Sequence, residues 1–166
     1  TSKKKNFSNL DFSKSPNIMG ILNLTPDSFS DGGKFNSKDK GINQAKLMYE
    51  SGANIIDVGG ESTRPGSKGV NEKVEWNRIN KLLKSICHKV TVSLDTRKSK
   101  IMKKGIKLGI RIINDVSGLN YDVETKNILK EYKIPFVIQH TKGTPENMQN
   151  NPNYKNVLLD IYDFFE

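Results

Sequence analysis

The chain has 166 residues, and 34% of them are hydrophobic, which is enough for one domain with a sizeable core. No run of about 18 apolar residues is present, so we expect no membrane-spanning segment and no membrane partner. The formal net charge is +9, but lysines occur in every part of the chain and form no single basic cluster, which argues against a nucleic-acid partner.

The chain divides into two parts by composition. Residues 1–16 form a basic N-terminal segment, and residues 17–166 carry the pattern of a folded domain. No apolar stretch of signal-peptide length follows the basic residues, and the one cysteine, Cys87, has no second cysteine for an internal disulfide. Both observations favour a reducing compartment, and we expect a cytoplasmic protein.

Short apolar runs alternate with amphipathic stretches along the domain. The first run, residues 18–22, has the character of a buried strand, and a polar loop of sequence NLTPDSFSDGG follows it. Residues 37–52 then predict a helix that begins at Ser37 and closes at Gly52. The remaining elements are predicted in the same alternating order, as strands at 54–60, 89–95, 110–115 and 135–140 and as helices at 71–88, 98–108, 122–132 and from 153 onward.

Five strand-to-helix units in a row predict a parallel sheet with helices outside it. Two architectures have this pattern, an open doubly wound sheet and a barrel of eight units. A barrel gathers its strand ends around one mouth, and the chain has no glycine-rich nucleotide loop that would favour the open sheet. Every predicted strand ends in polar side chains, which are Asn23, Asp57, Asp95, Asn114 with Asp115, and His140. We therefore predict a TIM (β/α)8-type barrel of the α/β class.

Each polar strand end also has a purely structural explanation. An Asn or Asp at a strand end often caps the next helix or makes a turn, and Asp95 is a candidate for such a cap. Asp57 lies in an apolar run, where it needs a partner such as the backbone or Arg64. Gly59 and Gly60 allow a sharp exit from the second strand. The functional interpretation depends on the whole set, because capping alone does not explain five polar ends out of five.

The residue types at the strand ends indicate a ligand. Arg64 has a planar guanidinium group that pairs with phosphate or carboxylate through two parallel hydrogen bonds. Asp95 and Asn114 suit the N–H groups of a flat, nitrogen-rich heterocycle. Asn23 offers a neutral oxygen to a hard cation such as Mg²⁺. An anion site, a polar ring site and Mg²⁺ together indicate a pyrophosphate ester of a heterocycle.

Two segments, IMGILNLTPDSFSDGG and GANIIDVGGESTRPGS, resemble the two signature segments of the dihydropteroate synthase family. VSLDTRK, IINDVSGL and HTKGTPENMQ resemble the family's third, fourth and fifth segments in the same order, so the resemblance covers residues 17–152. It implies a transferase of folate biosynthesis that joins a pterin pyrophosphate to p-aminobenzoate and releases pyrophosphate, with Mg²⁺ as the cofactor. Residues 17–166 are then a partial pterin-binding barrel domain with about five of the eight βα units.

The resemblance also implies roles for individual residues on two mobile loops and on the strand ends. Asn23 and Asp31 would bind the metal ion, and Thr63 and Arg64 would contact the substrate near its pyrophosphate. Phe29 and Pro65 would enclose p-aminobenzoate. Asp95 and Asn114 would line the pterin pocket. The residues expected to carry catalysis are Asp31, Arg64 and Asp95. The chemistry needs electrostatic stabilisation and exclusion of water more than a strong base.

Two features differ from the family pattern. Gln139 and Thr141 stand beside His140 where the family usually has methionines, and we expect them to change the floor of the pterin pocket. The chain also stops near its fifth helix, before the motifs of the last three units, so we expect no turnover from this chain alone. The alternatives are a non-catalytic remnant or pterin-binding module, and a generic sugar-phosphate barrel. A homodimer is expected only of a full-length protein, because the family pairs through later helices.

Overall fold

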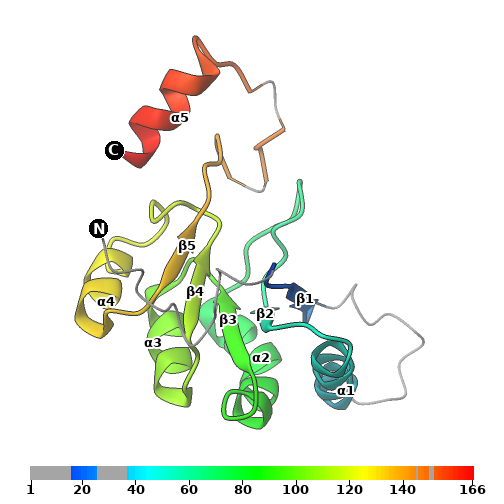
Figure 1. The fold of residues 1–166 in the computed structure, drawn as a ribbon. Coiled ribbons are helices and arrows are strands. Elements are labelled where there is room, and N and C mark those ends of the chain that lie inside the picture. Colours follow the sequence, from blue (N-terminus) through cyan, green and yellow to red (C-terminus); the bar gives the residue numbers. More distant parts are fainter. Residues whose placement is uncertain (1–15, 26–36, 145, 150–151) are drawn as a thin grey trace.

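The computed structural model describes residues 16–25, 37–144, 146–149 and 152–166, and the predicted segment 1–16 lies almost wholly outside them. Strands and helices alternate strictly along the described chain (Figure 1). In chain order they are β1 (Met19–Asn23), α1 (Ser37–Glu50), β2 (Ile55–Gly59), α2 (Glu72–Ile86), β3 (Thr91–Asp95), α3 (Ser99–Leu108), β4 (Ile112–Asp115), α4 (Thr125–Tyr132), β5 (Phe136–Ile138) and α5 (Val157–Phe165).

The strands form one parallel sheet. Their order in space is the same as their order in the sequence, from β1 to β5, and each strand pairs in parallel with the next. In a doubly wound sheet the order in which strands are added reverses at a switch point, whereas in a barrel each new strand is added next to the previous one on the same side. The strand order therefore confirms the α/β barrel class, with five βα units in the described residues.

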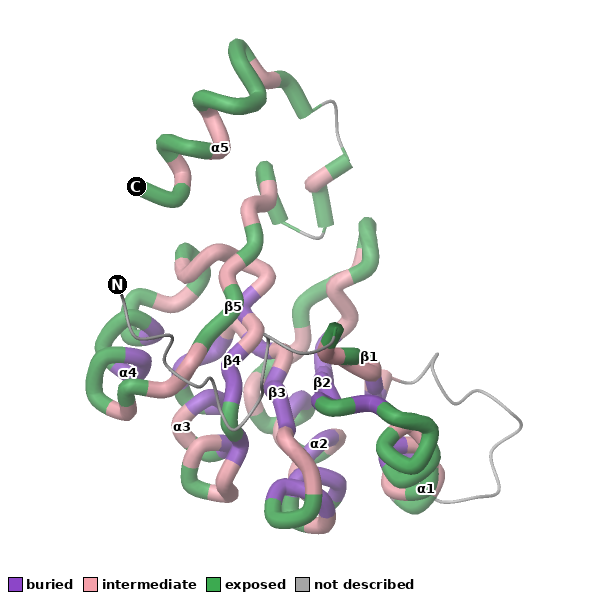
Figure 2. The backbone as a smooth tube through the Cα atoms, viewed as in Figure 1, coloured by how far each residue is buried: buried purple, intermediate pink, exposed green. Residues whose placement is uncertain are grey.

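One face of the sheet, which we call the outer face, carries the main apolar core. Alternate strand residues on this face pack against helices α1 to α4, and the buried segments gather between these two layers (Figure 2). Full burial of one such side chain stabilises the fold by about 1.5–3 kcal/mol. The strand residues of this core are Leu22, Ile56, Val58, Val92, Leu94 and Ile113.

The opposite, inner face of the sheet is more open. Ile55 and Ile112 are buried there and pack with Met19 in a small cluster. Further along the same face, the exposed fractions of Ile21 and Val137 are 64% and 41%. The inner face therefore has apolar residues at its base and accessible positions around them, and the polar strand ends belong to this face.

Capping fixes two helix ends where the sequence predicts them. The Asn71 side chain accepts a hydrogen bond from the Val74 N–H at 2.9 Å and so begins α2. Gly109 ends α3 with a φ of 96°, a left-handed conformation that favours glycine.

Two helices begin later than predicted, because side chains upstream make turns of their own. The Asp122 carboxylate accepts hydrogen bonds from the backbone N–H groups of Ser99 and Glu124, so α4 begins only at Thr125. The Asn156 side chain caps α5, which therefore begins at Val157 and not near residue 153. The same Asp122 contact supplies the cap of α3, so the interpretation of Asp95 as that cap is wrong.

Helix α5 lies apart from the sheet, beyond the end of β5 (Figure 1). It buries none of its residues fully, and Leu158 and Tyr162 are among its exposed apolar side chains. Its main link to the strand ends is the Phe164 ring, which meets the His140 ring edge to face with the ring centres 4.8 Å apart.

Candidate functional site

The sheet register brings the ends of four neighbouring strands to one level, and three of these ends carry polar side chains. Asn23 is paired with Gly59, Gly59 with Asp95, and Asp95 with Asn114. Paired residues of parallel strands direct their side chains to the same face, here the inner face. The predicted meeting of the strand ends is therefore confirmed for Asn23, Asp95 and Asn114, whereas the predicted end of β2, Asp57, lies two residues below this level.

Gly59 leaves space between two of these side chains. A Cβ atom at this position would lie 2.7 Å from Asn23 Oδ1 and 3.2 Å from Asp95 Oδ2, so both oxygens approach the place that a larger residue would fill. Gly59 is thus required for space above β2, which the expectation of a sharp strand exit did not include. A neutral oxygen and a carboxylate oxygen consequently face each other across the glycine.

Asp57 lies on the same face, two residues before Gly59. It is 4% exposed, and its Oδ2 accepts a hydrogen bond from Asn114 Nδ2 at 3.0 Å. The prediction that Asp57 bridges to the backbone or to Arg64 is wrong, because an amide two strands away takes that position. Burial raises the pKa of Asp57 above its ordinary value, and the neighbouring Ser93 and Asn114 side chains partly oppose this shift.

Asp95 lies among several other carboxylates. Burial, and after it the charges of nearby acidic residues, raise the pKa of Asp95 to about 8. The acidic residues that contribute are Asp57, Glu75, Asp115 and Glu61. Such a carboxyl group favours a ligand that brings N–H donors, because these donors stabilise its ionised form.

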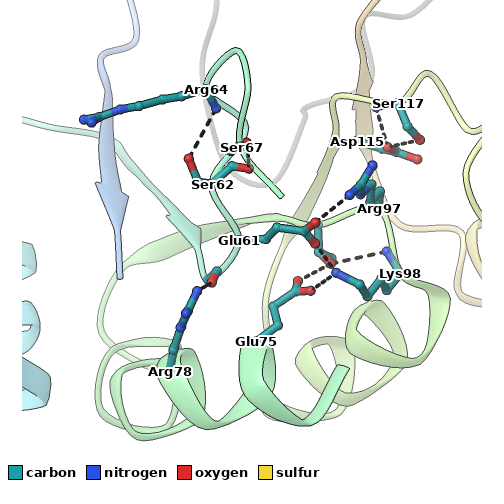
Figure 3. A network of polar contacts seen from close by, with 12 residues as sticks. Glu61, Ser62, Arg64, Ser67, Glu75, Arg78, Arg97, Lys98, Asp115 and Ser117 are labelled. Atoms are coloured by element: carbon teal, nitrogen blue, oxygen red, sulfur yellow. Dashed lines mark hydrogen bonds and ion pairs between the residues drawn. The ribbon is translucent and has the colours of Figure 1, made fainter. Parts of the chain in front are cut away.

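The second loop, residues 60–70, begins at the end of β2 and passes beside Asp95. Thr63 and Asp95 line one small hollow together. The next residues, Arg64 and Pro65, are exposed. The Arg64 N–H donates to Ser62 Oγ at 3.4 Å, while its side chain extends away from the base of the loop (Figure 3). The guanidinium group makes no hydrogen bond or ion pair with the described residues, so it is available to an anion.

A buried ion network, which no local pattern in the sequence predicts, anchors the base of this loop (Figure 3). The Lys98 ammonium group pairs with Glu61 and, at 2.5 Å, with Glu75 Oε2. Arg97 Nη2 pairs with Glu61 Oε1 at 2.5 Å, and Thr96 Oγ1 donates to Glu75 Oε1 at 2.5 Å. The sequence offers only a weak signal for this network, since Glu61 and Lys98 both lie within the short connections that follow β2 and β3.

The network keeps its central lysine charged. Burial acts to lower the pKa of Lys98, but hydrogen bonds and charges from Glu61 and Glu75 outweigh it and hold the pKa above its ordinary value. Because Glu75 lies in α2 and Lys98 is the residue directly before α3, the loop base is tied to two helices of the scaffold. Thr63 therefore has a fixed starting point close to Asp95.

Two predicted strand ends do not join this group. The carboxylate of Asp115, which follows Asn114 and so faces the other side of the sheet, accepts the N–H groups of Ser117 and Leu119 and makes a local turn. His140 packs against Tyr154 and Phe164 instead of reaching Asp95 or Asn114. The expectation that all five ends converge is therefore wrong for β5 and for Asp115.

The residues beside His140 line a separate cavity of about 190 Å³. Its walls include Gln139 and Thr141, together with Thr63 and Arg97 from the neighbouring ends. The Arg97 guanidinium group lies 4.1 Å from the centre of the Tyr121 ring, so the cavity wall is stiffened by a cation–π contact. Gln139 and Thr141 consequently shape this cavity, and their effect on the floor of the pterin pocket stays a prediction.

Two predicted residues, Phe29 and Asp31, lie outside the described residues, and their roles stay predictions. In the described ranges, no group of three His, Cys, Asp or Glu side chains is arranged to hold a metal ion. None of the described helices is long and apolar enough to span a membrane.

Known proteins are similar to this chain along most of its length. The profile of the pterin binding enzyme family matches residues 19–166. The dihydropteroate synthase of Synechocystis is 38% identical over 157 residues, which cover 93% of this chain and 54% of the relative. The dihydropteroate synthase of Clostridium beijerinckii is 43% identical over 146 residues, which cover 87% and 52%. The chain thus spans about half the length of these relatives.

Solved structures agree with this result. The dihydropteroate synthase of Yersinia pestis, solved with a sulfonamide drug, has a TM-score of 0.84 and 39% identity, covering 94% of this chain and 57% of that one. The enzyme of Xanthomonas albilineans, solved with 4-aminobenzoic acid, has a TM-score of 0.82 and 31% identity, covering 92% and 54%. By its sequence, its strand order and these likenesses, the chain belongs to the pterin binding enzyme family.

Proposed function

We propose that the protein acts as a dihydropteroate synthase, which condenses 6-hydroxymethyl-7,8-dihydropterin pyrophosphate with p-aminobenzoate to give 7,8-dihydropteroate and pyrophosphate. The observation that carries the proposal is the level of polar strand ends formed by Asn23, Asp95 and Asn114 around Gly59, with Thr63 beside Asp95. The dihydropteroate synthases that resemble this chain at 38–43% identity support the same activity.

The pterin ring is assigned to the inner face at β3 and β4. Asp95 and Asn114 are neighbours in the register, so one ring spans both side chains. The ionised Asp95 accepts two adjacent N–H groups, and Asn114 supplies an amide that both donates and accepts. Structures of relatives that hold 4-aminobenzoic acid or 7,8-dihydropteroate support the choice of substrates.

The anionic and aromatic parts of the substrates are assigned to the second loop. Arg64 is exposed and its guanidinium group is available for the pyrophosphate, which it pairs with through parallel hydrogen bonds. Thr63 faces the hollow next to Asp95, and Pro65 follows on the exposed side for p-aminobenzoate. With the loop base tied down by Glu61 and Lys98, movement is restricted to the tip, which closes over the ligands and excludes water.

The Asn23 oxygen at the end of β1 suits Mg²⁺. Asn23 Oδ1 and Asp95 Oδ2 both approach the space above Gly59, and hard cations prefer such oxygen ligands. A Mg²⁺ ion held by Asn23 would neutralise negative charge on the pyrophosphate leaving group. Asn23 is the proposed ligand in the described residues, and Asp31 remains a proposed ligand from the first loop.

Three further properties follow from the same assignment. We place the protein in the cytoplasm, with small molecules as its substrates and with homodimers in the full-length enzyme. The spread of lysines over the whole sequence supports the absence of a nucleic-acid partner.

Pyrophosphate release tests the proposed function. The relatives are about twice as long as this chain, so a chimera that joins it to the C-terminal half of the Clostridium beijerinckii enzyme is the direct test. With pterin pyrophosphate, Mg²⁺ and p-aminobenzoate we expect turnover by the chimera and none by the chain alone. Turnover that survives both Arg64→Ala and Asp95→Ala in the chimera contradicts the site, and pterin binding without turnover by the chimera indicates a binding module.

A further inference from the structure

Asp57 is a buried carboxylate whose role the proposed reaction does not explain. It is 4% exposed and lies one layer below the strand ends, two residues before Gly59. In the described residues its side chain pairs with no cation and contacts the amide of Asn114. A buried carboxylate costs stability unless a partner compensates it, so its position on the inner face needs a reason.

The hydrogen bond between these two residues crosses a whole strand. Asp57 is paired in register with Ser93, and Asn114 is paired with Asp95, so the bond from Asn114 Nδ2 to Asp57 Oδ2 runs diagonally over β3. Its length of 3.0 Å is that of an ordinary N–H···O bond. The small Ser93 side chain below and the Asp95 side chain above border its path.

This bond determines which end of the Asn114 amide faces the ligand. An amide has a donor end, Nδ2, and an acceptor end, Oδ1, and a carboxylate can only accept. The donor end is therefore held at Asp57, and Oδ1 is directed away from it. Without the carboxylate, the amide could turn over and present either end.

We propose that Asp57 is a positioning residue that holds the Asn114 amide with Oδ1 presented to an N–H group of the bound heterocycle. The inference rests on the proposed function only for the identity of that heterocycle, a pterin. It adds a specificity device to the site, because a ring with an acceptor in place of that N–H group meets an oxygen and is rejected.

A purely stabilising role explains the pair less well. Asp57 Oδ1 and Ser93 Oγ are both buried and have no aligned hydrogen bond with the described residues. Buried polar atoms without partners reduce stability by about 1–3 kcal/mol each. A layer optimised for stability would carry apolar side chains there, as Ile55 and Ile112 do at the base of the same face.

Three variants of the 166-residue chain test the inference by isothermal calorimetry with 6-hydroxymethylpterin. Asp57→Leu removes the acceptor, and we expect about tenfold weaker binding, the effect of one lost oriented hydrogen bond. Asp57→Asn keeps an oxygen for Asn114 Nδ2 and should restore affinity to within about threefold. Ser93→Ala removes a buried oxygen of the same layer and is the matched control, with unchanged affinity expected. In an Asn114→Ala background, Asp57→Leu should have no further effect.

A second readout reports the amide without any ligand. The side-chain NH₂ signals of Asn114 in a ¹⁵N NMR spectrum should keep their shift in Asp57→Asn and Ser93→Ala, and should move to solvent-like values with faster exchange in Asp57→Leu. If Asp57→Leu does not fold, Asp57→Ser replaces it, because the shorter side chain loses its reach to Asn114. An unmoved Asn114 signal, or an equal affinity loss in the Asn114→Ala background, overturns the inference. Absence of pterin binding by every protein, wild type included, contradicts the assignment of the pterin ring to the inner face of this chain, and the NMR result still decides the orientation of the amide.

Discussion

The two faces of the sheet are built on opposite principles. On the outer face, Leu94 and Ile113 are fully buried against helices, whereas on the inner face Ile21 is exposed and the strand ends are polar. The outer face provides cohesion between the strands and helices. The inner face holds buried or half-buried carboxyl groups such as those of Asp57 and Asp95, which reduce stability and serve binding. Stability and function therefore lie on two sides of the same five strands, and separate substitutions can test each side.

The largest expected effect is at the ion network, where charge is buried close to the functional face. Lys98→Met leaves Glu61 and Glu75 without their shared cation, and we expect the free energy of unfolding to fall by about 3–5 kcal/mol. Lys100→Met is the matched control, because Lys100 pairs with Glu72 at the surface, where an ion pair contributes about 1 kcal/mol or less. Urea titration followed by circular dichroism measures both. An equal effect of the two substitutions contradicts a buried network.

The next effect compares one isoleucine from each face. Ile113→Ala removes fully buried methyl groups from the outer core, and we expect a loss of about 2–5 kcal/mol in the free energy of unfolding. Ile21→Ala, at a position that is 64% exposed on the inner face, should change it by less than about 0.5 kcal/mol. The same urea titrations decide the matter. A large effect of Ile21→Ala shows that the inner face is covered in solution.

The pKa of Asp95 gives a smaller effect that depends on pH. With a pKa of about 8, the carboxyl group is mostly protonated at pH 7 and mostly ionised at pH 9. Ring N–H donors bind the ionised form, so pterin affinity should rise by about tenfold between pH 7 and pH 9. Calorimetry at both pH values measures the ratio, and Asp95→Asn should remove the dependence.

The same carboxyl group should make the free energy of unfolding fall as the pH rises, opposite to the expected rise in pterin affinity. The folded-state pKa of Asp95 lies above the ordinary value of 3.8, so folding favours the protonated form. The contribution of Asp95 to the free energy of unfolding is therefore fully present below about pH 4 and is lost as the pH rises through 8. A wild-type chain that gains stability over this range relative to Asp95→Asn would show that the carboxyl group is not buried.

The smallest expected change in stability is at the tip of the second loop. Arg64 is exposed and its guanidinium group has no partner in the described residues, so Arg64→Ala should shift the free energy of unfolding by less than about 0.5 kcal/mol. Its affinity for pyrophosphate, measured by calorimetry, should nevertheless fall by roughly 10- to 100-fold, because a charge-assisted pair is lost. Arg111→Ala is the control substitution. Arg111 is exposed and lies directly before β4, at the end of the sheet opposite the polar strand ends, so its removal should leave pyrophosphate affinity unchanged.

Much of the fold could be predicted because its signals are local. Asn71 and Gly109 mark helix ends through their own side chain and backbone, and the alternating apolar runs fix the order of the elements. The start of α4 was predicted too early, since the turn made by Asp122 involves Ser99, which is 23 residues away.

The candidate site was only partly predictable for the same physical reason. Asn23, Asp95 and Asn114 were predicted from their places at strand ends, because a parallel sheet brings such ends to one level. The pairing of Asp57 with Asn114 is a hydrogen bond that crosses β3, so neither local segment reveals it. The Lys98 network joins Glu61, Glu75 and Lys98, which come from three separate segments of the chain. His140 was misplaced because α5 supplies ring partners that no local pattern reveals.

Because Gly59 has no Cβ atom, one added methyl group is enough to block the space between the ends of β1 and β3. A methyl group there would lie 2.7 Å from Asn23 Oδ1 and 3.2 Å from Asp95 Oδ2, so it would displace the Asn23 side chain without altering the net charge of the chain. It would also lie on the inner face, away from the outer apolar core. We therefore expect Gly59→Ala to be a folded variant that does not bind the ligand. Such a variant would serve as the background control in the binding measurements.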